Sequence, residues 1–510
     1  MSHIRQGITS EEMDVYIKEA TNNPLKQLWL EQRLFPFGAP YHSQDGTLIL
    51  PMATFNRRMA RRLCDQLGIW DDLSAKGIVD ADPFVSENDE LRIKNLGLPM
   101  NFSWQVSSAI AESLCQIFKK KTAIEWEKEL SSKGVVAVRV QSFKEWMADE
   151  DAQRAKISAE VQGHEGQRQV GRTAFLKQAN GQSIAYPKLQ KLKEINDLNE
   201  VLDLTKSFKS NSIGKTEFHA KPLEGYVVVD FSNVLAGPNC GRMLCELGAT
   251  VYKVEPHNPQ HPPMVMVTWQ AEGNAGKKTI IVDFKSEEGK KVALDLVKLS
   301  DFVLINKSDG QVEHMGLDRG TLDQINAKAI HLNVQARRGE NIESESGMWP
   351  GYDPALQGKT GLSYRFGPTD CPTLHGVASC VDYATAYMGS WAGLIALWVR
   401  ETQGVSGLSS GTSLALTASL MQFTHLGDGE GSGRMPPQGP KATGPTTYTR
   451  TYKLAKTSPE KWVYVVADCD LSYDFANVFN SLEEALTNLT KRGFLAVEVM
   501  SCKTIGKYAI

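Results

Sequence analysis

The pattern of hydrophobic and polar positions becomes regular after about residue 223. Short apolar runs that suit buried strands alternate there with amphipathic segments that suit helices. The expected strands are 226–232, 250–255, 278–284, 301–306 and 329–335, and the clearest expected helices are 239–248 and 286–300. Strands and helices that alternate at this spacing are typical of βαβ units. The pattern therefore predicts an α/β fold with a parallel, doubly wound, Rossmann-like sheet covered by helices on both faces.

The first 200 residues follow a less regular pattern, which includes an expected strand at 45–53. Residues 124–147 suit a helix, a glycine turn, a strand and a second helix. Residues 482–505 repeat that outline when Gly134 is aligned with Gly493. A weak internal repeat is one interpretation, and a chance similarity of two helix–turn–strand segments is the other. Either way, a smaller α+β domain is expected beside the sheet domain.

A polar stretch without sustained periodicity separates these two parts of the chain and suggests a linker. With 510 residues, the chain is also longer than one ordinary hydrophobic core needs, so two or three domains are expected. The expected divisions are a first region at 1–204, a linker at 205–222, a Rossmann-like catalytic core at 223–425, a Gly/Pro-rich loop at 426–445 and a shortened final segment at 446–510.

Charge and cysteine content narrow the class of protein. The chain has 56 basic and 59 acidic residues and a formal net charge of -3. It therefore has no overall positive potential that would attract nucleic acid or an anionic membrane. Its eight cysteines are dispersed without a CxxC pair, so neither a disulfide framework nor a zinc site is expected. The sequence shows no secretory signal or apolar run of membrane-spanning length. A cytoplasmic or mitochondrial location is expected.

The most specific motifs lie in residues 223–256, LEGYVVVDFSNVLAGPNCGRMLCELGATVYKVEP. An apolar strand leads there into AGP at 236–238, and LGA at 247–249 leads into Lys253 and Glu255. This order resembles the opening of the class III CoA-transferase family (CaiB/BaiF type). That family includes formyl-CoA transferases, carnitine CoA-transferases and α-methylacyl-CoA racemases.

The resemblance extends over about residues 223–425, because 273–306 also follows the family pattern in order. Residues 1–200 resemble the smaller portion that ends a family member, placed here before the core. The chain therefore resembles either the end of one family copy followed by a second copy, or a permuted arrangement. The resemblance implies the class III CoA-transferase fold and a homodimer.

Asp382 stands at the head of an apolar segment, where the family has its catalytic aspartate. Its flanks, GYDPALQGKTG at 351–361 and LIALWVRETQG at 394–404, match the family pattern. The resemblance implies that Asp382 is the nucleophile. A carboxylate in an apolar setting is partly desolvated and can be aligned with a thioester carbonyl. The alternative from local sequence is that Asp382 is a helix N-cap.

The resemblance also implies residues that bind coenzyme A (CoA). The backbone of Val234, Leu235 and Ala236 is expected beside the CoA and the reacting carbonyl. Some oxalate- and formyl-using members carry Gln where this chain has Leu235, which disfavours an acid of that kind here. The remaining expected CoA-binding residues are Lys253, Lys277, Lys278 and Asn306. For each lysine, the alternative is an ordinary solvated surface side chain.

A glycine-rich segment follows the core, and the family has a glycine-rich loop over the aspartyl intermediate at a similar point. Gly429, Gly431 and Gly433 are therefore expected in a loop over the site, where backbone N–H groups stabilise an oxyanion. The Gly/Pro-rich residues that follow favour a flexible surface linker as the alternative.

The resemblance leads to one main functional hypothesis and two alternatives. The main hypothesis is an enzyme that transfers CoA from an acyl-CoA donor to a carboxylic acid acceptor through a covalent aspartyl intermediate. One alternative is an acyl-CoA racemase or lyase on the same fold, although the racemase branch uses a His where this chain has Tyr352. The other is a non-catalytic CoA-binding homologue. No metal or redox cofactor is indicated.

Overall fold

The computed structural model describes most of the chain as two compact units. Its larger unit comprises Met1–Tyr364 and Asp370–Gly433, and its smaller unit comprises Arg434–Ile510 with Arg365–Thr369. Below, the N-terminal region means the described residues up to 178, and the core means those from 221 to 423. The described residues are 7–20, 23–82, 84, 93–161, 168–178, 180, 221–257, 269–338, 349–365, 372, 374, 379–423, 449–454, 461–466, 479–491 and 494–498.

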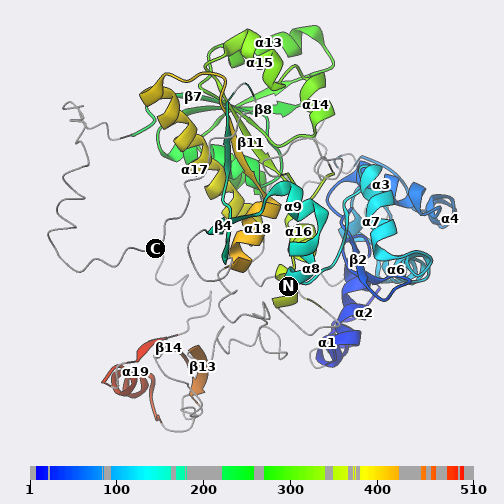
Figure 1. Cartoon of the computed structure of the whole chain (residues 1–510). Helices are drawn as coiled ribbons and strands as arrows, with labels where there is room; N and C mark the ends of the chain where they lie inside the picture. Colours follow the sequence, from blue (N-terminus) through cyan, green and yellow to red (C-terminus); the bar gives the residue numbers. More distant parts are fainter. Residues whose placement is uncertain are drawn as a thin grey trace. The chain divides into compact units, whose positions relative to one another are not determined.

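The core is built on a mixed sheet in which parallel pairs predominate (Figure 1). Among the described residues this sheet has seven strands, in the order β6 (Phe175–Lys177), β12 (Ser409–Ser413), β11 (Ile330–Gln335), β10 (Phe302–Ile305), β7 (Val227–Asp230), β8 (Thr250–Pro256) and β9 (Lys278–Val282). Neighbouring strands are parallel except β6, which runs antiparallel to β12. The five strands expected from the sequence are all present, and the α/β class is confirmed.

Alternate residues of the central strand β10 face different layers of helices. Val303 and Ile305 pack into an apolar cluster with residues of α13, α14 and α15, including Ala293 and Leu322. On the other face, an ideal Cβ at Gly393 of α17 would lie 3.4 Å from the Phe302 ring. The core helices are α11 (Ala236–Glu246), α12 (Ala271–Gly273), α13 (Glu287–Lys298), α14 (Asp309–His314), α15 (Arg319–Asn326), α16 (Asp353–Lys359), α17 (Cys380–Gln403) and α18 (Leu414–Phe423).

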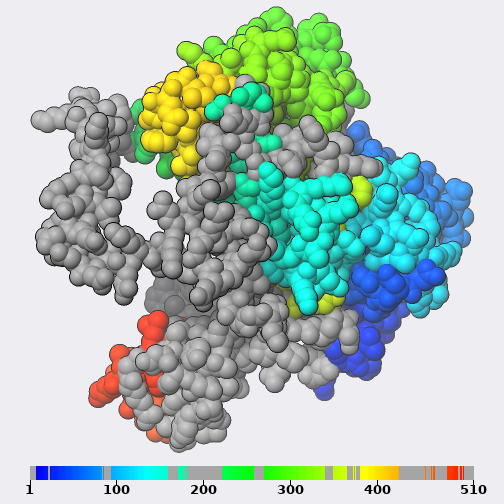
Figure 2. Space-filling view, viewed as in Figure 1, coloured from blue at the N-terminus to red at the C-terminus, as the bar shows by residue number. Residues whose placement is uncertain are grey.

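The N-terminal region is helical around a small antiparallel sheet, β1–β2–β3. The strands are β1 (Tyr41–His42), β2 (Leu48–Pro51), β3 (Ala137–Arg139), β4 (Ser158–Val161) and β5 (Arg168–Gly171), the last two forming a hairpin. The helices are α1 (Ser10–Ala20), α2 (Pro24–Leu34), α3 (Arg57–Gln66), α4 (Trp70–Ala75), α6 (Trp104–Phe118), α7 (Ala123–Ser132), α8 (Phe143–Ala148) and α9 (Glu150–Ala155). In Figure 2 their blue and cyan atoms form a continuous surface. A short 3₁₀ helix lies at Pro99–Asn101 in this region, and another, Leu362–Arg365, follows α16 of the core.

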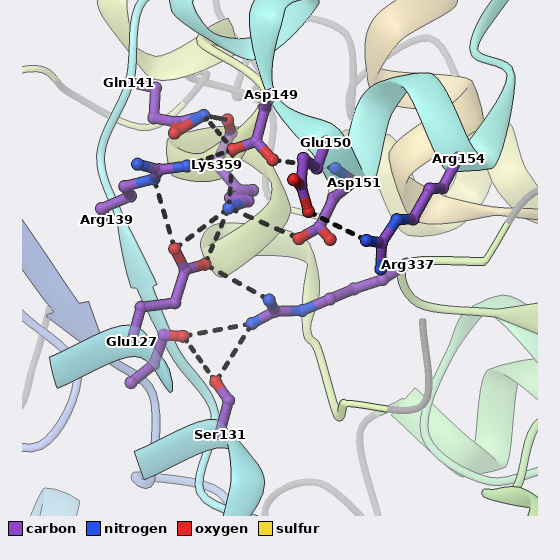
Figure 3. A network of polar contacts seen from close by, with 11 residues as sticks. Glu127, Ser131, Arg139, Gln141, Asp149, Glu150, Asp151, Arg154, Arg337 and Lys359 are labelled. Atoms are coloured by element: carbon purple, nitrogen blue, oxygen red, sulfur yellow. Dashed lines mark hydrogen bonds and ion pairs between the residues drawn. The ribbon is translucent and has the colours of Figure 1, made fainter. Parts of the chain in front are cut away.

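A buried network of charges joins the N-terminal region to the core (Figure 3). Glu127 of α7 lies 3.3 Å from Arg337, which follows β11, and 3.0 Å from Lys359 Nζ of α16. Lys359 also contacts Asp149, which is 3.1 Å away. Glu127, Arg337 and Lys359 are each at most 3% exposed. The strand β6 adds a second connection, because it belongs to the N-terminal region and pairs with β12 of the core.

The smaller unit has a three-stranded antiparallel sheet and one helix among its described residues. These elements are β13 (Thr449–Leu454), β14 (Lys461–Val466), α19 (Leu482–Lys491) and β15 (Leu495–Glu498). In both α7–β3 and α19–β15, a helix leads into a strand that pairs antiparallel at the edge of a three-stranded sheet. The helix and the strand expected for the internal repeat are therefore present in both segments, whereas Gly493 and the residues after 498 lie outside the described residues.

Candidate active site

The turn after β7 forms one wall of the candidate site, and a side chain from the neighbouring strand holds it. Asn306 follows β10, and its side-chain oxygen accepts a hydrogen bond from the Asn233 backbone N–H at 2.8 Å. Its amide nitrogen donates to the Asn233 carbonyl at 2.7 Å. Since the strand order reverses between β7 and β10, this turn lies where open α/β sheets bind ligands. Asn306 therefore positions the turn.

The backbone of this turn is strained at Val234. Its φ is +69°, in the left-handed region that a β-branched residue seldom adopts, at a cost of about 1–3 kcal/mol. The chain then enters α11 through Gly237. An ideal Cβ at Gly237 would lie 2.3 Å from Ser232 Cβ and 3.2 Å from the Asn306 amide nitrogen, so only glycine fits. The sharp turn thus depends on close packing of Gly237 against Ser232 and Asn306.

Asp382 lies in the first turn of α17, but it does not cap that helix. The capping role belongs to Asp353, at the beginning of α16. Asp353 Oδ2 accepts hydrogen bonds from the backbone N–H groups of Val381 at 2.7 Å and Asp382 at 3.0 Å. The residue before α17, Ser379, forms no capping hydrogen bond. The N-cap interpretation of Asp382 is therefore wrong, and its own carboxyl group does not serve these donors.

The surroundings of Asp382 favour its neutral form. Its side chain is buried, with 9% exposed. Burial, and then the charge of Asp353, raise the pKa of the Asp382 carboxyl well above its ordinary value. A helix N-terminus by itself would favour the ionised form, but Asp353 already occupies the N–H groups there. Asp382 is thus a poorly solvated carboxyl group with a raised pKa.

A cavity of about 690 Å³ is lined by Asp382 and by several of the residues expected to bind CoA. Val234, Leu235, Ala236 and Asn306 line the same cavity as Asp382, although these five residues come from three distant segments of the chain. The N-terminal region contributes another wall. Its lining residues are Asn56, Arg58, Met59, Arg62, Ser131, Ser132 and Gly134.

The three lysines expected to bind CoA do not line this cavity. Lys253 and Lys277 are buried inside the core. Lys277 Nζ donates at 2.7 Å to both Asp230 and the Pro238 carbonyl. Lys253 Nζ donates to the Ser232 carbonyl. Lys278 is exposed, with Nζ 5.4 Å from the centroid of the Tyr252 ring. Lys253 and Lys277 thus bind acceptors inside the core. Their hydrogen bonds to the Ser232 and Pro238 carbonyls stabilise the two ends of the turn after β7.

Other cations line the cavity instead, and sequence reasoning missed them. They are Arg58, Arg62, Lys307 and Arg338. Burial, and then the nearby Lys253, lower the pKa of Lys307 to about 8. A signal for Lys307 was present, since it directly follows Asn306 at the carboxyl end of a core strand. No comparable signal marked Arg58 and Arg62, because α3 lies far from the motifs along the chain.

Tyr352, which replaces the His expected of a racemase from the sequence pattern, also lines the cavity. Burial, and then the charge of Asp382, raise the pKa of its hydroxyl group, which stays neutral. The glycines expected over the site, Gly429, Gly431 and Gly433, lie outside the described residues. Among the described residues, no group of three or more His, Cys, Asp or Glu side chains is placed to hold a metal ion. In that same part of the chain, no helix combines the length and hydropathy of a membrane span.

Comparison with known proteins identifies the family. The model of CoA-transferase family III matches residues 9–191 and 223–487. The chain therefore belongs to CoA-transferase family III. This confirms the resemblance found in the core and shows that most of the N-terminal region also carries family sequence.

Curated relatives include the CoA-transferase/lyase DddD of Marinomonas sp. (strain MWYL1), which is 25% identical over 440 residues. That alignment covers 83% of this chain and 51% of DddD. The probable fatty acyl-CoA transferase Rv3272 of Mycobacterium tuberculosis is 32% identical over 203 residues, covering 37% of this chain and 49% of that protein. The chain thus spans about half the length of the curated relatives it matches. A crystal structure of Rv3272 is similar over 56% of this chain and 85% of that one, with 22% identity and a TM-score of 0.45.

Proposed function

We propose that this chain transfers CoA from an acyl-CoA donor to a carboxylic acid acceptor, with Asp382 as the covalent nucleophile. The observation that carries the proposal is that Asp382 lines one cavity with Val234, Leu235 and Ala236. Family membership supports CoA transfer in general. The strand order, with its reversal between β7 and β10, supports a doubly wound arrangement in which CoA lies at that reversal.

The first half of the reaction releases the donor acid. The ionised carboxylate of Asp382 attacks the thioester carbonyl of the acyl-CoA. The C–S bond then breaks, CoA departs as its thiolate, and a mixed anhydride between Asp382 and the donor acid remains. The thiolate then attacks the Asp382 carbonyl carbon of that anhydride. This second attack forms an aspartyl-CoA thioester and releases the donor acid as its carboxylate.

The second half reverses these steps with the acceptor. The acceptor carboxylate attacks the aspartyl-CoA thioester and again releases CoA thiolate, which leaves a second mixed anhydride. Attack of the thiolate on the acceptor's acyl carbon forms the new acyl-CoA and restores the Asp382 carboxylate. Leu235 and Ala236 stand at the beginning of α11, where the first backbone N–H groups have no acceptor within the helix. Such donors would stabilise the oxyanions of these steps.

The raised pKa of Asp382 has opposite effects on this chemistry. It makes the ionised carboxylate more basic and less solvated, which strengthens it as a nucleophile. It also reduces the ionised fraction when the pH is below that pKa. The first attack therefore proceeds only from the deprotonated form, and the rate should fall as the pH is lowered through the raised pKa.

A lyase activity is the second candidate, because the alignment with the CoA-transferase/lyase DddD covers 83% of this chain. A racemase has less support, since Tyr352 lies in the cavity where that branch has a His base. Product analysis separates the three activities. A transferase forms a new CoA ester only when an acceptor acid is present, a lyase cleaves the acyl group, and a racemase exchanges its α-hydrogen.

The experiment that tests the proposal traps the intermediate. The full chain is mixed with a panel of acyl-CoAs and quenched with hydroxylamine, and its peptides are mapped by mass spectrometry. A hydroxamate at Asp382 is expected, with a donor dependence that identifies the preferred acyl-CoA. Asp382→Asn should lose the adduct and reduce turnover by about three orders of magnitude or more, as expected for loss of a covalent nucleophile.

Asp295→Asn is the matched control, because Asp295 is an aspartate paired with Lys291 and Lys298 on the exposed face of α13. It should form the adduct and turn over as the wild type does. Turnover without any adduct at Asp382, or an adduct that survives Asp382→Asn, would contradict the assigned nucleophile.

A further inference from the structure

Helix α3 carries four arginines that fall into two classes. Arg57 and Arg61 have acidic partners: Arg57 Nε lies 2.5 Å from Asp80, and Arg61 Nε lies 2.9 Å from Asp65. The Arg61 guanidinium also lies over the Trp70 ring, 3.9 Å from its centroid. These two arginines are thus accounted for by contacts within the N-terminal region.

Arg58 and Arg62 have no such explanation. They stand four residues apart, so they lie on the same side of α3. Both are exposed, and within the described part of the chain neither forms an ion pair or hydrogen bond. Both line the cavity that contains Asp382. The Arg62 guanidinium lies against the turn after α7, because an ideal Cβ at Gly134 would be only 2.9 Å from Nη1.

The other two cations of the cavity already have acceptors. Arg338 forms an ion pair with Asp309 of α14. In the amide orientation that satisfies both groups, the side-chain oxygen of Asn233 accepts a hydrogen bond from Lys307 Nζ at 2.8 Å. Among the described residues that line the cavity, Asp382 is the only acid. The positive charge of the two α3 arginines is therefore uncompensated on the cavity wall.

We propose that Arg58 and Arg62 bind an oxyanion of the substrate, so that the N-terminal region completes the substrate site within the same chain. The inference rests on the proposed function. The oxyanion is either a phosphate of CoA or the carboxylate of the acid, which offer the same acceptor chemistry. Two guanidinium groups one helical turn apart present many N–H donors, which suits a phosphate with several acceptor oxygens.

The test compares CoA binding by the full-length wild type, Arg58→Gln/Arg62→Gln and Arg61→Gln. Arg61→Gln is the matched control, since it also removes a positive charge from α3 but faces Asp65 and Trp70. Affinities for CoA and for 3′-dephospho-CoA are measured by calorimetry, and thermal melts check that each variant is folded. The double variant should bind CoA more weakly by roughly tenfold per arginine, the size of a lost charge-assisted contact, whereas the control binds normally.

The outcomes separate the two sources of the oxyanion. If the double variant binds CoA more weakly than the wild type but binds 3′-dephospho-CoA equally well, the arginines contact the 3′-phosphate. If its affinity for both ligands falls equally, the arginines contact the diphosphate. Unchanged CoA binding with a raised KM for the acid assigns them to the carboxylate. The inference is wrong if the folded double variant binds CoA and acid like the wild type. It is also wrong if Arg61→Gln loses as much affinity as the double variant does.

Failure of the proposed function gives a different result. A wild type that binds CoA through these arginines but never transfers it would overturn CoA transfer and leave the assignment of Arg58 and Arg62 intact. If the folded double variant binds and transfers CoA normally, the assignment of Arg58 and Arg62 is wrong and the proposed CoA transfer stands.

Discussion

Two carboxyl groups stand together at the beginning of α17, and they have different environments. Asp353 is hydrogen-bonded to the backbone N–H groups of Val381 and Asp382, and to Gln357 Nε2 at 2.5 Å. Asp382 is buried, with its pKa raised. A buried carboxyl group whose pKa is raised by desolvation and a neighbouring charge is characteristic of acid–base and nucleophilic sites. This asymmetry gives each residue its own testable consequence.

Asp382→Asn should change how stability depends on pH. The pKa of Asp382 is raised on folding, so between the unfolded value of about 4 and the folded value the native state holds a proton that the unfolded state has lost. This group's contribution to stability therefore falls as the pH rises through that window. The Asn variant should lack this fall and be more stable at pH 8, by about 0.5–2 kcal/mol. Urea unfolding at a series of pH values measures the difference, and parallel curves for the two proteins would contradict the raised pKa.

Asp353 should act on Asp382 through its charge and on α17 through its hydrogen bonds. Asp353→Asn keeps an acceptor oxygen but removes the charge that raises the pKa of Asp382, so the acidic limb of kcat/KM should move to lower pH. Asp353→Ala removes the cap as well and should cost a further ~1 kcal/mol of stability. The pH–rate profile and the unfolding midpoint separate these effects. A purely structural Asp353 would leave the profile of the folded Asn variant unmoved.

At the scale of elements, β12 is a buried strand whose sequence has no large apolar residue, and close packing of small residues allows it to form. Its sequence, Ser409–Ser413, is SSGTS, yet it lies inside the sheet between β11 and β6. An ideal Cβ at Gly411 would lie 1.9 Å from the Asn333 carbonyl oxygen of β11, so the strands can approach only through this glycine. Small residues thus allow a strand that apolar content did not predict.

Gly411→Ala should therefore weaken the pairing of β12 with β11. The added methyl group must displace the backbone of Asn333, and overpacking of this kind costs about 1–3 kcal/mol. Gly310→Ala is a matched control, since Gly310 lies in α14 with no heavy atom within 4 Å of an ideal Cβ. In that control the free energy of unfolding should rise by about 0.5–1 kcal/mol, because alanine has a higher helix propensity than glycine. Chemical unfolding of the two variants should show shifts of opposite sign, and equal shifts would exclude the steric explanation.

At the scale of the larger unit, the buried charge network determines how its two regions depend on each other. Three carboxyl groups, Glu127, Asp149 and Asp151, meet three cations, Arg139, Arg337 and Lys359. The network contains residues of the N-terminal region and of the core, so neither region can satisfy these charges alone. We expect the two regions to unfold as one cooperative unit, although the sequence suggested separate domains.

Lys359→Met should remove the lysine that Glu127 and Asp149 share, which leaves them only Arg337 and Arg139, and should destabilise the fold by about 3–5 kcal/mol. Adding Glu127→Gln to this variant should restore part of the loss, because a buried charge is removed together with its partner. The surface variant Lys291→Met is the control, since Lys291 pairs with Asp295 in solvent and should unfold at nearly the wild-type denaturant concentration. Additive effects of the two core substitutions would show that the charges are not coupled.

The sequence by itself determined the features that depend on neighbouring residues. The alternation of apolar runs and amphipathic segments predicted β7 to β11, and the flanks of Asp382 marked it as the candidate nucleophile. Strands and short motifs are local, so their signal lies in a continuous piece of chain. Val234, Leu235, Ala236 and Asn306 line the same cavity as Asp382, and their role in binding CoA stays a prediction.

Only the tertiary structure decided which charged groups face the cavity. Lys277 bonds Asp230, which is 47 positions away, and so does not line the cavity, whereas Arg58 comes into it from a helix of the N-terminal region. The cap on α17 is likewise supplied by Asp353 from another helix. A long charged side chain takes its partner from whatever the fold brings within a few ångströms, and that choice is not encoded in its sequence neighbours.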